Sequence, residues 1–183
     1  MFRNKVIAIA AVLAALAVSC TKEDVKTTYS RQEQNIEAFV KSILSSVDTA
    51  YVVYNNGASR VVVSYGDGDS LSAGGNVAFR YAGYVLSGSS LGNSNLFSTN
   101  SSEVASAAGW SLSDESMFEV KEADLDKSGF IEGLRYGLEG VRAGQECYIL
   151  FSGKYGFGKR PLGTIPANSA LAYHIWVESI SND

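Results

Sequence analysis

Two stretches in the second half of the chain decide the fold: residues 130–145, FIEGLRYGLEGVRAGQ, and residues 163–173, GTIPANSALAY. The first stretch predicts a short helix over residues 133–141. Strands are expected over residues 147–152 and 170–180, where apolar and β-branched or aromatic side chains recur. The second half of the chain should therefore combine one short helix with strands of a β-sheet.

The middle of the chain also has the pattern of a β-sheet. Residues 51–54 and 60–65 are rich in Val and Tyr, and they flank Asn55-Asn56-Gly57, a sequence typical of a tight hairpin turn. Two further strands are predicted, over residues 76–86 and 118–120. Residues 87–116 are rich in Ser, Gly and Asn and are predicted to form a long loop.

A helix is predicted over residues 30–47, before the first strand. Ser30 and Glu33 match a capping box, which marks a helix N-terminus. Apolar residues then recur at spacings of three and four and form one face: Ile36, Phe39, Val40, Ile43 and Leu44. This face is expected to pack on the core of the domain, and a dimerisation helix is the alternative.

The first 19 residues are predicted to be a secretory signal peptide. Arg3 and Lys5 precede an unbroken apolar run over 6–18, which is too short to span a membrane as a helix. The run ends in Leu16-Ala17-Val18-Ser19-Cys20, which resembles the lipobox of bacterial lipoproteins. The resemblance implies a lipid on Cys20, followed by a polar tether over residues 20–29.

The residues after Cys20 favour an outer-membrane location. Thr21 stands where an Asp would resemble an inner-membrane retention signal, and Lys22-Glu23-Asp24 is similar to a surface-export tag of some Gram-negative lipoproteins. The expected location is the cell envelope of a Gram-negative bacterium, lipid-anchored in the outer membrane at its periplasmic face or at the cell surface.

The two stretches quoted first, together with Tyr155-Gly156-Phe157-Gly158, resemble the second half of an FKBP-type peptidyl-prolyl cis-trans isomerase domain. Their order and spacing match the family pattern V-I-x-G-W-x-x-G, then Y-A-Y-G, then I-P-P-x-A-x-L-x-F. Upstream, residues 77–83, VAFRYAG, are similar to the family's V-x-V-x-Y-x-G strand. The resemblance covers about residues 58–181.

This resemblance implies an α+β fold, in which an FKBP-like twisted antiparallel β-sheet wraps a short α-helix, with the N-terminal helix added to it. The FKBP-like domain is expected over residues 50–183, with insertions near 89–96 and 101–115. The second insertion carries Trp110 and is expected near the mouth of the pocket.

The resemblance also implies an apolar pocket that grips proline. Cis/trans exchange at an X-Pro bond crosses a barrier of about 20 kcal/mol because amide resonance resists twisting. A pocket that favours the twisted amide needs no nucleophile, metal or cofactor. The catalytic residues carried over are Tyr81, Phe97, Ser98, Ile131 (through its N–H), Leu134, Phe157 and Tyr173, and the further substrate-binding residues are Phe118, Phe130 and Ile165. The alternative is that these are ordinary core residues of a sheet.

Three of these positions differ from the family pattern. Ser98 replaces an Asp, Phe157 replaces a Tyr and Leu134 replaces a Trp, while Tyr173 stands where the family has Phe. The lost hydrogen bonds correspond to roughly 2–4 kcal/mol, and so to a roughly 30- to 1000-fold slower reaction if they act on the transition state.

Three functions follow from these observations. The first is a prolyl isomerase with weakened activity that acts on X-Pro bonds of exported proteins. The second is a non-catalytic FKBP-like binding or chaperone lipoprotein. The third is a surface protein whose fold is a scaffold for the inserted loop at 101–115.

Composition excludes other classes of protein. The net charge is −4 and there is no basic patch, so nucleic acid is not expected as a partner. No cofactor or metal is expected, because the one histidine, His174, has no partner pattern and should lie on the outward side of a strand. Cys147 is interpreted as a small buried apolar residue. The expected partners are proline-containing exported polypeptides, and the membrane through the lipid on Cys20.

Overall fold

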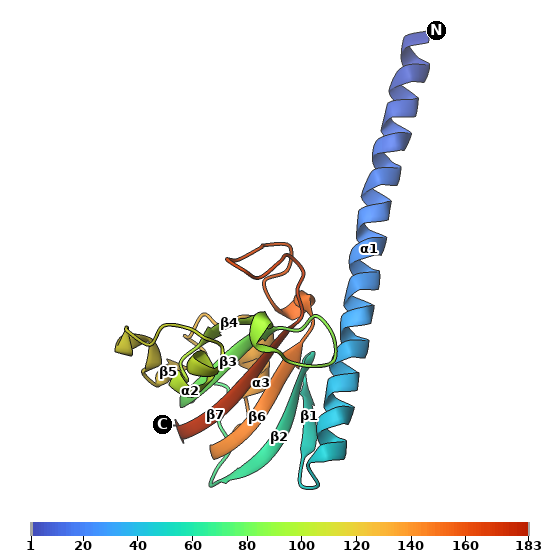
Figure 1. Ribbon diagram of the computed structural model, residues 1–183. Helices are drawn as coiled ribbons and strands as arrows, with labels where there is room; N and C mark the ends of the chain where they lie inside the picture. Colours follow the sequence, from blue (N-terminus) through green and yellow to red (C-terminus); the bar gives the residue numbers. More distant parts are fainter. Residues whose placement is uncertain (1, 183) are drawn as a thin grey trace.

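The centre of the fold is one seven-stranded antiparallel sheet, seen in a computed structural model that describes residues 2–182, with side chains from Glu23 onward (Figure 1). The strand order is β1-β2-β6-β7-β3-β4, and β5 also pairs with β3. The strands are β1 (Tyr51–Asn55), β2 (Ala58–Asp67), β3 (Asn76–Val85), β4 (Leu96–Thr99), β5 (Lys121–Asp124), β6 (Ala143–Phe151) and β7 (Leu171–Ser181). The expected α+β fold is confirmed.

The hairpin between β1 and β2 forms where Asn55-Asn56-Gly57 predicts it. Asn55 pairs with Ala58, which leaves a two-residue loop. Asn56 and Gly57 have φ angles of 47° and 90°, in the left-handed region that this turn requires and that Asn and Gly tolerate best.

The helices are α1 (Phe2–Ser46), α2 (Ser102–Ala107) and α3 (Glu132–Leu138), and the 3₁₀ turns are η1 (Asn93–Asn95), η2 (Glu115–Phe118) and η3 (Gly153–Tyr155). The helix predicted over 133–141 is therefore confirmed as α3, although it ends earlier. The strand predicted over 118–120 is wrong: η2 occupies its start, and β5 begins only at Lys121.

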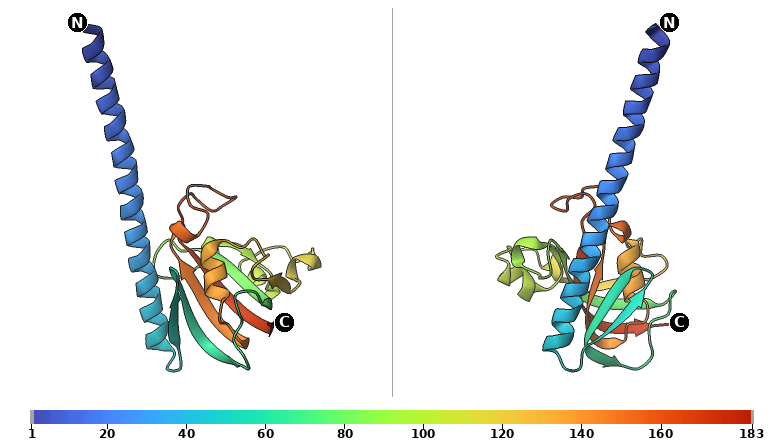
Figure 2. Two further views of the ribbon diagram at one scale, coloured as in Figure 1. Left: turned by 180° about the vertical axis from the view of Figure 1, so that it is seen from behind. Right: turned by 90° about the vertical axis from the view of Figure 1, so that its right-hand side faces the viewer.

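The N-terminal helix is longer than its sequence pattern predicts. The residues expected to form a tether, 20–29, lie inside α1, and Ser30 is therefore not a helix N-cap. The physical reason is that residues 2–46 contain neither Gly nor Pro, so nothing in the sequence ends the helix there. Figure 2 shows α1 projecting beyond the sheet at its N-terminal end.

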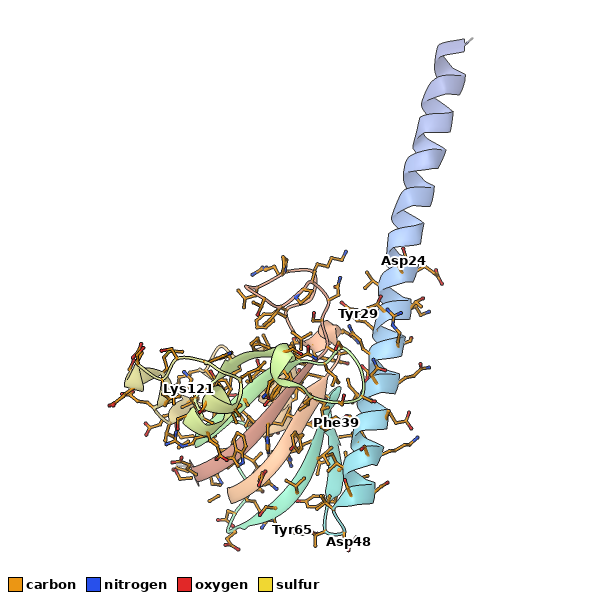
Figure 3. All side chains as sticks on the ribbon, viewed as in Figure 1. Asp24, Tyr29, Phe39, Asp48, Tyr65 and Lys121 are labelled. Atoms are coloured by element: carbon orange, nitrogen blue, oxygen red, sulfur yellow. The ribbon has the colours of Figure 1, made fainter. Side chains whose placement is uncertain are left out.

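Helices α1 and α3 pack on opposite faces of the sheet (Figures 1 and 2). Successive residues of a strand point to opposite faces. On β6, Ile149 therefore packs in the cluster of α3, whereas Leu150 packs in the cluster of α1. The apolar face of α1 contributes Ile36, Phe39 and Val40, so it packs on the core of its own domain as predicted (Figure 3).

The predictions of a signal peptide over residues 1–19 and of a lipid on Cys20 fall on residues whose side chains lie outside the described part of the molecule. Between residues 23 and 182, where the side chains are described, no helix is both long and apolar enough to cross a membrane.

Helix α3 lies unusually close to β6 because two glycines face the strand. Gly133 and Gly137 are four residues apart and so share a helix face. A Cβ atom on Gly137 would lie 2.1 Å from Cγ2 of Ile149, and one on Gly133 would lie 2.2 Å from Cγ of Phe151. The close packing of the helix in the concave side of the sheet therefore depends on these glycines.

Substituting Gly137→Ala should lower the free energy of unfolding by about 1–3 kcal/mol, because the added methyl overpacks the contact with Ile149. The loss should appear although Ala favours the helix by up to about 1 kcal/mol. Urea denaturation measures it. The control is Gly88→Ala, since Gly88 has no neighbour within 4 Å and no left-handed φ; equal midpoints for the two variants would contradict the close-packing argument.

Candidate functional site

A cavity of about 230 Å³ opens on the α3 side of the sheet. Its lining comes from β3, β4, β5, β7, α3 and the residue before the N-cap of α3, so segments far apart in the chain meet there. The lining residues are Phe79, Tyr81, Phe97, Ser98, Lys121, Phe130, Leu134 and Tyr173. The structure thus brings together six of the ten site residues that the sequence predicts.

Aromatic rings form most of the cavity wall. Tyr173 contacts Phe97 edge to face at 5.8 Å between ring centroids, and the centroid of Tyr81 lies 6.2 Å from that of Tyr173. Phe130 meets Phe79 edge to face at 6.1 Å. Such a wall is apolar, and its rings hold one another in place.

Gly83 makes room for this wall on β3. A Cβ atom there would lie 2.7 Å from Cζ of Phe97 and 3.1 Å from Cε1 of Tyr173. Any side chain at this position would therefore push the two rings into the cavity.

The polar groups of the cavity include one hydrogen-bonded pair of hydroxyls. The Tyr81 hydroxyl and Oγ of Ser98 lie 2.9 Å apart and form a hydrogen bond. Both residues come from neighbouring strands, because β3 pairs with β4 through Gly83 and Ser98. The position where the family has Asp therefore still contacts the tyrosine of the wall, but through a neutral group.

Asn100, which sequence reasoning missed, fixes the strand that carries Tyr81. Its Oδ1 accepts a hydrogen bond from the Tyr81 N–H at 2.6 Å, and its Nδ2 donates to the carbonyls of Phe79 and Glu119 at 3.2 and 2.9 Å. Asn100 is buried, so these bonds are shielded from water. It joins β3 to the segment before β5.

Four predicted site residues do not line the cavity. Ile165 is buried in the same core cluster, and Ile131 and Phe157 pack against that cluster. Ile131 is the N-cap of α3, and its N–H has no hydrogen-bond acceptor among residues 23–182. Phe118 does not line the cavity either; its carbonyl accepts a hydrogen bond of 2.8 Å from the Arg80 guanidinium.

Two lining residues were not predicted. Phe79 lies two residues before Tyr81, and strand alternation places both on one face, so the sequence contained this signal. Lys121 gave no signal, because the loop before it has no periodicity. It is exposed and lies on the side of the sheet away from α1 (Figure 3).

The predicted position of Trp110 near the mouth of the pocket is wrong. Trp110 packs against Ala82, Tyr84 and Leu96. These residues point away from the cavity, since they alternate with Tyr81, Gly83 and Phe97. The insertion turns to that face because α1 leaves this apolar part of the sheet uncovered and Trp110 buries it.

The remaining reactive side chains lie away from the cavity opening. Cys147 is fully buried, and burial raises the pKa of its thiol to about 12, so it is inert. His174 lies on the α1 side of the sheet, where it is half-buried and its ring stacks on Tyr148 at 4.2 Å. Burial lowers the pKa of His174, and a hydrogen bond of 2.7 Å to Glu146 partly opposes that shift.

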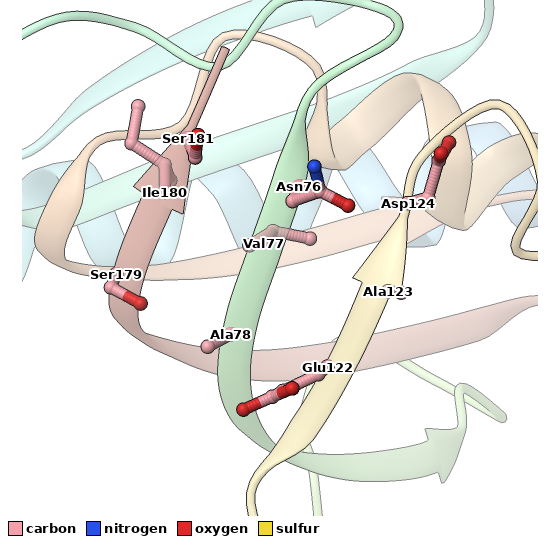
Figure 4. A pocket seen from close by; sticks show the side chains of 9 residues that line it. All are labelled: Asn76, Val77, Ala78, Glu122, Ala123, Asp124, Ser179, Ile180 and Ser181. Carbon is pink, nitrogen blue, oxygen red and sulfur yellow. The ribbon is translucent and has the colours of Figure 1, made fainter. Parts of the chain in front are cut away.

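A second hollow, of about 390 Å³, crosses β5, β3 and β7 (Figure 4). Figure 4 shows Glu122 and Asp124 on β5 and Asn76 on β3, and no aromatic side chain lines this hollow. It has none of the rings that could hold a proline, so the smaller aromatic cavity is the candidate site.

The family model for FKBP-type peptidyl-prolyl cis-trans isomerases matches residues 68–178. The chain belongs to this family. The matched range contains every residue that lines the aromatic cavity.

Solved structures with FKBP domains share the fold. The three FKBP domains of wheat FKBP73 align with a TM-score of 0.56 at 17% identity, covering 73% of this chain and 50% of that one, so the chain spans half the length of the wheat structure. FkpA from Escherichia coli aligns with a TM-score of 0.56 at 18% identity over 94% of this chain and 71% of that chain.

A peptidyl-prolyl isomerase from Pseudomonas syringae gives a TM-score of 0.53 at 18% identity over 82% of this chain and 96% of that one. At identities this low, these likenesses establish the fold alone. No curated protein matches the sequence.

Proposed function

We propose that the aromatic cavity binds proline in exported polypeptides and catalyses cis/trans exchange of their X-Pro bonds, with weakened activity. The observation that carries this proposal is the meeting of six predicted site residues from β3, β4, β7 and the α3 region around one cavity of about 230 Å³. That volume suits a proline ring and its adjacent amide rather than a larger ligand.

The mechanism rests on shape and desolvation. The rings of Tyr81, Phe97 and Tyr173 would surround the pyrrolidine ring and hold its amide out of water. A twisted amide is less polar than a planar one, so an apolar wall stabilises it relative to the ground state. The N–H of Ile131 would donate a hydrogen bond to a carbonyl oxygen of the bound peptide.

Exchange spectroscopy by NMR on an Xaa-Pro tetrapeptide tests this function. The protein should make cis/trans exchange of the peptide faster than the uncatalysed exchange, which takes tens of seconds. The peptide resonances should also shift on titration. An unchanged exchange rate at protein concentrations equal to that of the peptide would contradict catalysis.

A non-catalytic binding or chaperone function is the second candidate. It is favoured by the neutral Tyr81–Ser98 pair and by Phe157, which offers no hydroxyl. In this case the peptide would bind and aggregation of an unfolded client would slow, without faster exchange.

We also propose that the chain is a lipoprotein, anchored to the outer membrane through Cys20. The support is the signal-like segment and the lipobox-like sequence at 16–20. Cys20→Ala should release the protein from the membrane fraction and remove the mass of the acyl chains. Cys147→Ala, at the only other cysteine, should stay membrane-bound; release of both variants, or of neither, would contradict the proposal.

A further inference from the structure

The wall of the cavity contains a tyrosine hydroxyl that binds nothing in the protein. Tyr173 is only 6% exposed, yet no residue from Glu23 to Asn182 forms a hydrogen bond with its hydroxyl. Two buried side-chain atoms of the described residues lack both a partner and contact with solvent, Arg60 Nε and Ser152 Oγ. The Tyr173 hydroxyl is not one of them, so it keeps contact with the cavity that its residue lines.

The ring of Tyr173 is held on three sides. Phe151 stacks on it with centroids 6.0 Å apart, and Phe97 meets it edge to face at 5.8 Å. Gly83 lies directly beside Cε1. Because the ring cannot turn freely among these neighbours, the direction of its hydroxyl is fixed before any ligand arrives, which is the condition for a preorganised donor.

The Tyr173 hydroxyl has no partner among the described residues, so its hydrogen-bonding capacity can be satisfied only by a molecule in the cavity. A phenylalanine would fill the same wall without offering this donor. Burial, together with the nearby Tyr81, also raises the pKa of Tyr173, so its hydroxyl keeps its proton and remains a donor across the physiological range.

The other polar groups of the cavity are occupied or exposed. The Tyr81 and Ser98 hydroxyls bind each other. Lys121 is exposed, and its long side chain has many conformations. Tyr173 is therefore the fixed and uncommitted hydroxyl among the residues that line the cavity.

We propose that the Tyr173 hydroxyl donates a hydrogen bond to a carbonyl oxygen of the proline-containing segment in the cavity. It thereby takes a polar role that neither Ser98 nor Phe157 supplies. This inference rests on the proposed function, because it requires that an X-Pro peptide occupies the cavity. Tyr173 is then a catalytic residue that acts through its oxygen as well as through its ring.

The test compares Tyr173→Phe with the full chain and with Tyr148→Phe. Tyr148 receives the same substitution but lies on the α1 side of the sheet, remote from the cavity. NMR titration with an Xaa-Pro tetrapeptide gives the affinity, exchange spectroscopy on the same samples gives the rate, and thermal unfolding gives the midpoint.

Loss of one neutral hydrogen bond predicts that Tyr173→Phe lowers affinity or exchange rate about 3- to 10-fold, whereas Tyr148→Phe changes neither. The unfolding midpoint of Tyr173→Phe should not fall, because the hydroxyl has no partner in the protein. Unchanged binding and exchange in Tyr173→Phe would overturn the inference while leaving the proposed function intact, and a lowered midpoint would overturn it by revealing an internal partner. If the unsubstituted chain neither binds nor exchanges the peptide, the proposed function is wrong and the inference falls with it.

Discussion

The double variant Ser98→Asp/Phe157→Tyr should exchange X-Pro bonds roughly 30- to 1000-fold faster than the unsubstituted chain. Oγ of Ser98 lies 2.9 Å from the Tyr81 hydroxyl, so a carboxylate at this position would form a charge-assisted hydrogen bond within the cavity. The tyrosine at 157 would add a hydroxyl to a side chain that packs on the same core cluster. Exchange spectroscopy on an Xaa-Pro peptide measures the gain.

The single variants divide this effect. Ser98 lines the cavity and Phe157 does not, so Ser98→Asp alone should carry the larger share. Ser89→Asp, which adds the same charge at an exposed position, should leave the rate unchanged. A folded double variant that exchanges at the original rate would show that these two positions are misassigned.

Arg60→Met should lower the free energy of unfolding by about 3–5 kcal/mol, a large part of the stability of an ordinary domain. Arg60 is 6% exposed, and its guanidinium donates to the carbonyls of Gly137, Glu139 and Gly140 at the C-terminal end of α3. Met keeps the apolar volume but leaves these carbonyls without their donor in a buried place. The expected cost is therefore that of broken hydrogen bonds rather than of a cavity.

Urea denaturation at neutral pH measures this change, with Arg142→Met as the matched control. Arg142 is exposed and its guanidinium makes one hydrogen bond, of 2.7 Å, to the carbonyl of Gly68, so the loss of this side-chain bond should cost about 1 kcal/mol or less. If both variants unfold at the same urea concentration, the guanidinium of Arg60 does not hold the end of α3.

Much of the fold could be predicted from local patterns. The Asn55-Asn56-Gly57 turn and the strand over 76–86 depend on a few adjacent residues, and both form where they were expected. The sequence pattern placed the start of the N-terminal helix at Ser30, whereas α1 begins at Phe2. A capping box marks a helix N-terminus only where the residues before it are not helical. Residues 20–29 contain nothing that forces them out of the helix.

The site could be predicted only as far as family spacing reaches. The family spacing predicted that Tyr81, Phe97 and Tyr173 lie around one cavity, and they do. It does not indicate which polar groups of the cavity have hydrogen-bond partners. The role of Asn100 and the position of Trp110 depend on how the long segment after β4 folds over the sheet. The local pattern around Arg60 does not indicate that its side chain is buried, because that burial depends on the packing of α3.

Helix α1 also binds the loop between β6 and β7. The Gln32 side chain accepts a hydrogen bond from Gly153 N–H at 2.9 Å and donates to the Asn168 carbonyl at 2.6 Å, and the Tyr29 hydroxyl donates to Oδ1 of Asn168 at 3.0 Å. Helix α1 is therefore hydrogen-bonded to the rest of the domain at these residues, and it continues toward Cys20 without interruption.

If the chain is lipidated at Cys20, the link between the lipid and the domain is a rigid helix rather than a flexible tether. A helix running from Cys20 to Gln32 is roughly 18 Å long, so it would set the height and the bearing of the aromatic cavity above the membrane. A flexible linker of the same length would let the domain sweep a volume around its anchor. Held on a rigid helix, the cavity would meet only those polypeptides that pass at one distance from the membrane, so the length of the helix would contribute to the choice of polypeptide.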